Sequence, residues 1–305
     1  MKKIFSIILF TLIGALLLSG CGQNKDGLVA KVNDISITQE EFDEDFQVYK
    51  GLYEKQLGED ALSQLGMDGK TLGDSLKESI LEKLIMEKLI GEDSVLLGIQ
   101  VSEDDLKQYI EDYIESMGGE ESYKAFLETN NLSEGFFNNS MNKELILNNH
   151  KEHIISGITL DENEAKEFFQ ENSEKLVEVK ANHILLGSEE DAIMILERID
   201  AGESFEDLAK TESLDSVSGI RGGDLGYFSK GDMIAEFEEA AFTLQVGEIS
   251  EVVKTEVGYH IIQMIDKLDT FEELEEKSYN LMKENQYFQY IQALRDEADI
   301  KKYIE

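Results

Sequence analysis

The chain has 305 residues, with 28 Lys and Arg against 65 Asp and Glu, which gives a formal net charge of −37. This charge argues against nucleic acid as a partner, because binding to phosphates needs a basic surface. The single Cys excludes an intramolecular disulfide and a zinc site built on paired cysteines, and four His leave little room for a His-rich metal centre. The length and a hydrophobic fraction of 41% favour two folded domains.

The N-terminal segment is typical of a leader that is removed from the mature chain. Two lysines follow the first residue, and an uncharged apolar run over 4–18 is shorter than the roughly 20 residues that span a bilayer. Small residues then precede Cys21, and this stretch resembles a bacterial lipobox, in which the Cys is lipidated and starts the mature chain. The alternative is an ordinary signal peptide followed by a chance Cys. We expect a signal peptide over 1–20 and a lipidated tether over 21–27.

Residues 28–176 are predicted to be mostly helical after two short strands over 28–32 and 35–37. A capping-box pattern, in which a Ser or Thr stands three residues before an acidic residue, opens the first helix at Thr38. The same pattern predicts helix starts at Ser102, Thr159, Ser204 and Thr270. Apolar residues at i, i+4 spacing make 71–98 the clearest helix, and further helices are expected over 133–155 and 161–175.

Two histidines, His150 and His153, lie at i, i+3 spacing in the predicted helix over 133–155. Their spacing differs from the HExxH zinc motif, in which the two histidines are four residues apart. We therefore expect a solvated helix face here, with a metal site as the alternative.

The pattern changes near Leu176, where an α+β module begins. The elements expected there, in chain order, are a strand over 177–186, helices over 189–201 and 204–212, a Gly-rich loop over 219–226, a helix over 233–243, and a closing antiparallel strand pair over 249–253 and 257–265. After Asp269 the chain is predicted to be helical to about Ala298, and this last helix is expected to pack on the N-terminal ones.

Four separate blocks of this module resemble the parvulin family of peptidyl-prolyl isomerases. They are VKANHILL (179–186), GGDLGYF (222–228), MIAEFEEAAF (233–242) and GEISEVVKTEVGYHII (247–262). The segment VAKVNDISITQEEF (29–42) is similar to the N-terminal chaperone region of SurA-like and PrsA-type proteins. Together with the lipobox, these motifs make the whole chain resemble the PrsA-type extracytoplasmic foldases of Gram-positive bacteria.

The resemblance implies an α+β fold with a parvulin domain inserted into a chaperone domain. The mostly helical chaperone domain would cover 28–176 and be completed by a C-terminal helix over 269–305. The inserted domain over 177–268 would carry a four-stranded antiparallel sheet. The implied protein is a foldase, lipid-anchored through Cys21 on the extracytoplasmic face of a Gram-positive cell membrane. Its partners would be unfolded or partly folded exported proteins, and the resemblance leaves both a monomer and a homodimer open.

The implied activity is cis/trans isomerisation of X-Pro bonds, which needs no cofactor, metal or covalent nucleophile. The family positions that line the proline pocket match Leu225, Phe228, Met233 and Phe237. Met233 and Phe237 are i, i+4 and are expected to share one helix face. Periodicity alone would make these residues ordinary core.

The family's central histidine pair matches His183 and His260, and Thr255 matches a polar residue that reaches them. The resemblance implies that the two rings hydrogen-bond each other and orient the site; on its own, a His in such an apolar run is more often a core residue. Asp215 matches a position that is Cys or Asp in parvulins, where a carboxylate would act on the substrate amide. Its alternative is a loop Asp in an Asx turn, and the stretch over 215–223 is one residue longer than is usual in the family.

Two other functions remain as alternatives to the isomerase. The first is a holdase chaperone that keeps an inactive parvulin fold. The second, more remote, is a solute-binding lipoprotein, whose chains show long alternating βαβ patterns that this chain lacks. The acidic segment over 187–191 follows His183, where phosphate-directed parvulins carry basic residues, so phosphorylated substrates are not expected.

Overall fold

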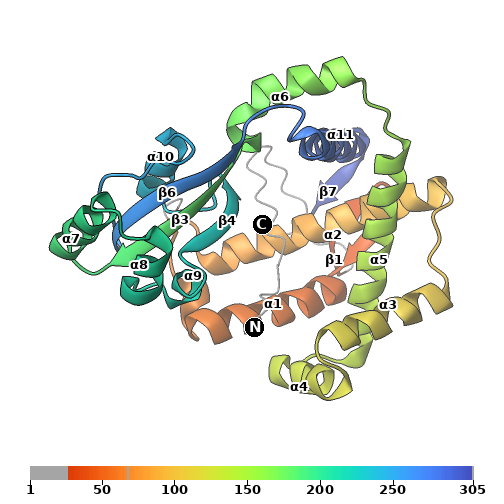
Figure 1. Cartoon of the computed structure of the whole chain (residues 1–305). Coiled ribbons are helices and arrows are strands. Elements are labelled where there is room, and N and C mark those ends of the chain that lie inside the picture. Colours follow the sequence, from red (N-terminus) through yellow and green to blue (C-terminus); the bar gives the residue numbers. More distant parts are fainter. Residues whose placement is uncertain (1–26, 67–68, 304–305) are drawn as a thin grey trace. The chain divides into compact units, whose positions relative to one another are not determined.

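A computed structural model describes residues 27–66 and 69–303, so the predicted signal peptide and Cys21 lie outside the described residues. The chain divides into two compact units, one formed by Met1–His153 with Ile291–Glu305 and the other by Ile154–Tyr290. The domain boundaries expected from the sequence stay a prediction. Figure 1 follows the elements of both units along the chain.

The first unit combines a small sheet with long helices. Its elements are β1 (Leu28–Val32), β2 (Ile35–Thr38), α1 (Gln39–Leu57), a 3-10 turn (Ala61–Ser63), α2 (Leu72–Leu96), α3 (Glu103–Ser116), α4 (Glu120–Asn130), most of α5 (Glu134–Gly157) and β7 (Ile300–Lys302). The sheet order is β2-β1-β7, and the pairing of β7 with β1 was not predicted. A three-residue strand is too short to show the alternation that identifies strands.

The core of this unit forms around the apolar rows of α2, as their spacing predicted. Leu84 and Ile85 are fully buried there, together with Val29 and Ile37 from the strands. Ala298 and Ile300 from the end of the chain pack against the same cluster, and Arg295 forms an ion pair with Glu82 of α2. These contacts confirm that the C-terminal segment packs on the N-terminal helices.

The predicted helix starts are confirmed where a capping hydroxyl accepts from the third backbone N–H, which occurs at Thr38, Ser102 and Ser204. The predicted start at Thr159 is wrong, because Asp161 caps α6 (Glu162–Leu176) with hydrogen bonds from Asn163 and Glu164. The capping bonds at Thr270 do form, but they close a turn that precedes α11 (Glu275–Glu297).

The expected solvated face at His150 is also wrong. His150 is fully buried, and its Nε2 lies 2.8 Å from Oδ2 of the buried Asp93 in α2. His153, one helical turn later, is exposed. A charged partner on another helix allows a polar ring to be buried, and the spacing along one helix does not reveal that partner.

The second unit is built on a four-stranded antiparallel sheet in the order β4-β3-β6-β5. Its elements are α6, β3 (Glu178–Leu186), α7 (Glu189–Asp200), α8 (Phe205–Glu212), α9 (Ser216–Gly219), β4 (Asp224–Ser229), α10 (Ala235–Thr243), β5 (Val253–Thr255), β6 (Gly258–Leu268) and the start of α11. The expected α+β class and the four-stranded sheet are confirmed. The expected strand over 249–253 is wrong, because Ile249 forms only an isolated bridge and the paired strand begins at Val253.

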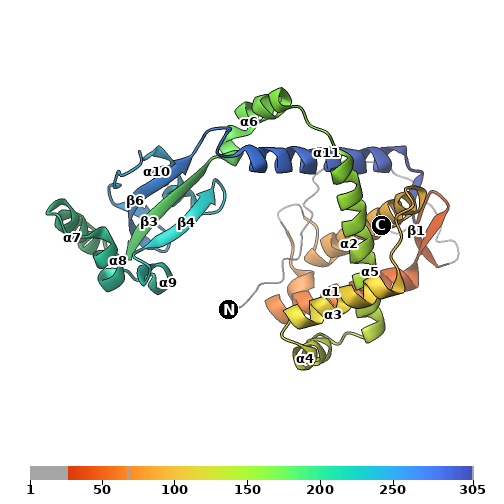
Figure 2. The same cartoon turned by 45° about the vertical axis from the view of Figure 1, so that its right-hand side comes forward.

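The sheet has two different apolar faces, each covered by its own helices (Figure 2). On one face Val179 and Ile262 pack against α10 through Phe237 and Ala241. On the other face Ile184 and Ile261 pack against α7 and α8. Alternate residues of a strand point to opposite faces, so one strand supplies both cores.

The ends of the sheet are tied to α6 and α11 within the same unit. Phe169 of α6 packs against Phe271 and Leu274, which precede α11. The ammonium of Lys277 donates to the Leu176 carbonyl at 2.9 Å and to the Glu178 carboxylate at 2.7 Å. Lys277 therefore links the start of α11 to the end of α6 and to the first residue of β3.

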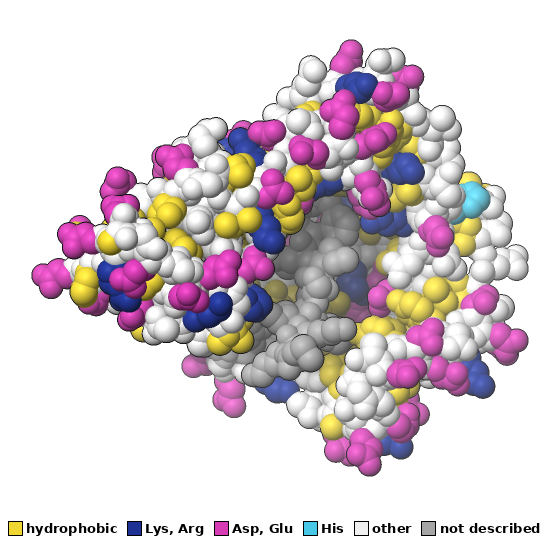
Figure 3. Space-filling model, viewed as in Figure 1, with side chains coloured by type: hydrophobic (Ala, Val, Ile, Leu, Met, Phe, Trp, Pro, Cys, Tyr) yellow, Lys and Arg dark blue, Asp and Glu magenta, His cyan; other side chains and the backbone are white. Residues whose placement is uncertain are grey.

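Acidic side chains are spread over the visible face of the molecule in Figure 3 and do not gather on one element. Over 27–66 and 69–303, no helix combines the length and the apolarity that a membrane span requires.

Candidate active site

The sheet brings His183 of β3 and His260 of β6 to the same face. In the antiparallel register His183 stands opposite Ile262 and His260 stands opposite Leu185, which makes the two histidines diagonal neighbours. Their Nδ1 atoms lie 3.2 Å apart, and the rings are nearly parallel, with an interplanar angle of 20°. Both side chains are buried. Residues 77 positions apart thus form one hydrogen-bonded pair.

Asp215 extends this pair toward solvent. Its Oδ2 lies 2.9 Å from Nε2 of His183, while its Oδ1 accepts from the backbone N–H groups of Val217 and Ser218 at the start of α9. The carboxylate is therefore both the loop cap and a partner of the histidine. The long 215–223 stretch folds into α9 and tight turns, and these place Asp215 beside the pair.

Ser218 belongs to this cluster and was not predicted. Its hydroxyl is buried, lies 3.0 Å from Nε2 of His183 and donates to Oδ2 of Asp215. A capping Asp brings the residue three positions later close to its own carboxylate. The spacing of Asp215 and Ser218 could therefore have predicted that Ser218 joins the cluster.

Thr255 completes the chain of polar groups at the other end, because its Oγ1 lies 2.9 Å from Nε2 of His260. A carboxylate only accepts, so Nε2 of His183 carries the proton shared with Asp215. His260 is neutral, so if its Nδ1 donates to Nδ1 of His183, its Nε2 accepts from the Thr255 hydroxyl. The donors then run in one direction and determine both tautomers.

The pKa values of the cluster follow from burial and hydrogen bonding. Burial and the neighbouring His183 lower the pKa of His260 to about 4, against the opposing effect of the Asp215 charge. Burial by itself raises the pKa of Asp215, but hydrogen bonds from Ser218, His183 and the α9 backbone outweigh it and hold the pKa well below its usual range. At neutral pH the site therefore holds a neutral His260 and an ionised Asp215.

We expect His260 to titrate near pH 4 in the folded chain, against 6.5 in the unfolded chain. Between these values the unfolded chain binds a proton at this ring and the folded chain does not. The free energy of unfolding therefore falls as the pH is lowered from 6.5 to 4, by about 3 kcal/mol in total. Nitrogen-15 NMR of the histidine rings checks this, and a His260 midpoint near 6.5 would contradict it.

The four residues predicted to line the proline pocket lie in one apolar cluster. Phe228 and Phe237 are buried, and Leu225 and Met233 are half-buried and pack against them. The expectation that Met233 and Phe237 share a helix face is wrong. The helix α10 begins at Ala235, so Met233 stands before its first turn and reaches the cluster from the preceding loop.

Phe237 joins the apolar cluster to the polar one. Its ring meets His183 edge-on at a centroid distance of 5.7 Å and His260 at 5.3 Å, and it also contacts Phe228 at 6.1 Å. An aromatic edge over both imidazoles excludes water from them on this side. The arrangement is an apolar, partly open surface beside a carboxylate and a buried histidine pair.

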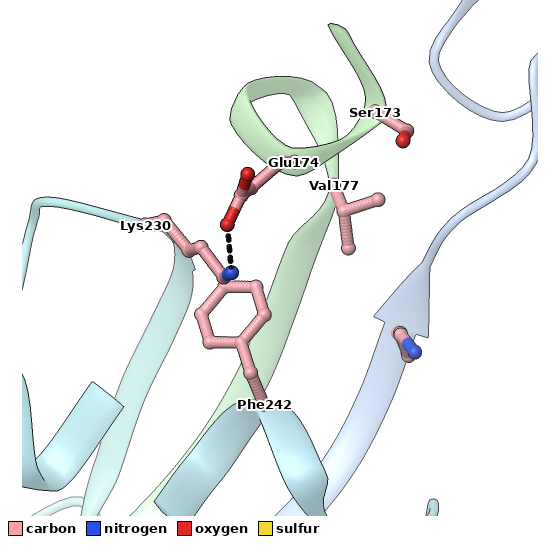
Figure 4. A pocket seen from close by; sticks show the side chains of 6 residues that line it. Ser173, Glu174, Val177, Lys230 and Phe242 are labelled. Atoms are coloured by element: carbon pink, nitrogen blue, oxygen red, sulfur yellow. Dashed lines mark hydrogen bonds and ion pairs between the residues drawn. The ribbon is translucent and has the colours of Figure 1, made fainter. Parts of the chain in front are cut away.

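A separate cavity of about 330 Å³ opens near the end of α6 (Figure 4). It is lined by Ser173, Glu174, Val177, Lys230, Phe242 and Lys267. Its two lysines already have partners, since Lys230 pairs with Glu174 and Lys267 with Asp269. It shares no residue with the histidine cluster. Among the described residues, no group of three or more His, Cys, Asp or Glu is arranged to hold a metal ion.

Comparison with known proteins matches both halves of the chain to known domains. Residues 167–268 match the family of PPIC-type peptidyl-prolyl isomerase domains, and residues 1–151 match the SurA-like N-terminal domain. The chain is 36% identical to a foldase protein PrsA of Halalkalibacterium halodurans over 234 residues, which cover 73% of this chain and 68% of that protein. It is 35% identical to a foldase protein PrsA 2 of Bacillus cereus over 268 residues, covering 87% and 78%.

A crystal structure of a peptidylprolyl isomerase (PrsA) from Bacillus anthracis is also similar. It is 32% identical, with coverage of 70% of this chain and 95% of that chain and a TM-score of 0.38.

Proposed function

Because this chain belongs to the PrsA foldase family, we propose that its histidine cluster and the adjoining apolar pocket form the site that isomerises X-Pro bonds. The protein is a foldase with a parvulin-type peptidyl-prolyl isomerase domain, and it acts on unfolded protein chains. The observation that carries the assignment of the site is the hydrogen-bonded run from Thr255 through His260 and His183 to Asp215, with Phe237 edge-on to both rings. A homodimer stays a prediction.

The energetic problem of the reaction is the loss of amide resonance. An X-Pro bond rotates over a barrier of about 18–20 kcal/mol, because twisting removes the partial double bond. Resonance places negative charge on the carbonyl oxygen of X, and twisting withdraws that charge. A carboxylate beside this oxygen raises the energy of the planar amide more than that of the twisted amide, which lowers the barrier. The ionised Asp215 is the group that we assign to this role.

The histidine pair serves as a positioning element in this proposal. The reaction moves no proton, so it needs neither ring as a general acid or base. His183 holds the Asp215 carboxylate by one hydrogen bond, and His260 and Thr255 hold His183 in the matching tautomer. The proline ring would lie against Leu225, Met233 and Phe237, away from water, where a less polarised amide is favoured.

Met233→Ala is expected to lower kcat/KM for the peptide Ala-Ala-Pro-Phe about tenfold. Truncation removes about 1.5 kcal/mol of apolar contact with the proline ring, and the half-buried side chain leaves the core intact. The rate is measured on the full chain by exchange NMR. Met194→Ala is the matched control, because Met194 is a half-exposed methionine on α7 of the same unit. An unchanged rate in Met233→Ala would contradict the pocket, and a folded parent without activity would favour a holdase.

The anchor belongs to the same proposal. The only Cys of the chain directly follows the expected leader over 1–20, which supports lipidation at Cys21 and would hold the foldase on the outer face of the cell membrane. Labelling cells with a radioactive fatty acid is expected to mark the parent protein and not Cys21→Ala. Label on Cys21→Ala, or a parent without label, would contradict the anchor.

A further inference from the structure

Three large aliphatic side chains are exposed within seven residues of the site loop. Leu214 is 64% exposed, Val217 is 67% exposed and Ile220 is 75% exposed. Single exposed aliphatic residues are normal on a protein surface. Three of them in the short segment that also carries Asp215 are more informative, since exposed apolar surface that gathers in one place often marks an interaction site.

The loop that carries these side chains is held in place by hydrogen bonds. The N–H of Leu214 donates to the Leu185 carbonyl at 2.8 Å, and the Ser213 hydroxyl accepts from the N–H of Leu185. Asp215 caps the start of α9, and the Ser218 carbonyl accepts a hydrogen bond from the Gly223 N–H at 2.9 Å. A surface that is already ordered loses little entropy when a ligand binds to it.

The loop has an inner polar side and an outer apolar side. Asp215 and Ser218 point to His183, whereas Val217 between them is exposed to solvent. The short helix α9 packs against β3 and β4, the strands that carry His183 and Leu225. The three aliphatic side chains therefore stand, exposed to solvent, on the loop that borders the site on its Asp215 side.

We propose that Leu214, Val217 and Ile220 form a subsite for the side chain of residue X in X-Pro, and that this subsite selects apolar X. The inference rests on the proposed function, in which Asp215 faces the carbonyl of X. That carbonyl belongs to X itself, so the side chain of X is the part of the client nearest to the residues that flank Asp215. Unfolded chains expose apolar side chains, so such a preference matches the clients of a foldase.

The test compares Ala-Leu-Pro-Phe with Ala-Gly-Pro-Phe as substrates of the full chain. We expect kcat/KM to be about tenfold higher for the leucine peptide, as burial of a leucine side chain predicts. The double variant Val217→Ser/Ile220→Ser should reduce this ratio to about two, mainly through KM, with the glycine peptide unaffected. Ile193→Ser/Met194→Ser is the matched control, because these half-exposed apolar residues lie on α7.

The outcomes separate the two proposals. An unchanged leucine-to-glycine ratio in Val217→Ser/Ile220→Ser, or a ratio near one in the parent, would overturn the subsite while the isomerase site stands. An equal fall of the ratio in the α7 control would also overturn it. Failure of the folded parent to turn over either peptide would overturn the proposed site, and the subsite with it.

Discussion

Replacing Gly223 by alanine is expected to lower the free energy of unfolding of the isomerase unit by at least about 3 kcal/mol. Gly223 has a φ of +88°, and a Cβ there would stand 2.4 Å from the carbonyl oxygen of His183 and 3.0 Å from its nitrogen. The clash is with backbone, so no side-chain rotation relieves it. It also displaces the hydrogen bond at 2.9 Å from the His183 N–H to the Gly223 carbonyl.

Gly226→Ala is the matched control for this variant. Gly226 also has a left-handed φ, at +73°, but a Cβ there would meet nothing within 4 Å. Its expected cost is the left-handed conformation alone, about 1–2 kcal/mol. Hydrogen exchange of the β3 and β6 amides in the full chain measures both values. Equal effects of the two substitutions would show that the close approach at Gly223 contributes nothing.

The second large effect is expected for Asp215→Ala, which should lower kcat/KM for an X-Pro peptide by about 100-fold. The substitution removes the charge proposed to act on the carbonyl of X, and it leaves Nε2 of His183 without its carboxylate partner. It also removes the cap of α9, for which about 1 kcal/mol of stability is expected. Peptide isomerisation and hydrogen exchange of the same full-chain sample separate the two losses.

Asp215→Asn distinguishes the charge from the cap. Asparagine caps a helix as well as aspartate does, so the cap of α9 should be kept, and the loss of stability that remains reports the charge held by Ser218 and His183. We expect kcat/KM still to fall about tenfold. Ser204→Ala removes the cap of α8 in the same unit and should cost stability without a matching loss of rate. Full activity in Asp215→Asn would contradict an electrostatic role for this residue.

Both results bear on how His183 is positioned. The strand β3 presents the ring, Gly223 pairs with its backbone and Asp215 bonds to its Nε2. The three contacts come from segments separated by up to 40 residues, so no local pattern describes them. The role of each residue in catalysis stays a prediction until the variants are measured.

Much of the fold could be predicted because its patterns are local. The apolar rows of α2 repeat at helical spacing, the caps at Thr38 and Ser102 lie next to their helices, and the parvulin-like blocks name the strands that carry the histidines. Local sequence patterns predict a helix start wrongly where a nearby residue can cap the helix instead, or where the apolar spacing continues beyond the end of the helix. Asp161 is an equally good cap near Thr159, and α10 begins after Met233 although the apolar spacing continues through it.

By itself the sequence determined the class of the protein: an acidic chain with a helical region and a parvulin-type module that carries two histidines in its strands. Only the tertiary structure decided which groups touch. It buries His150 against Asp93, adds Ser218 to the histidine cluster and pairs β7 with β1 across the length of the chain. The physical reason is that propensity and periodicity act between near neighbours, whereas hydrogen-bond partners and burial depend on the packing of distant segments.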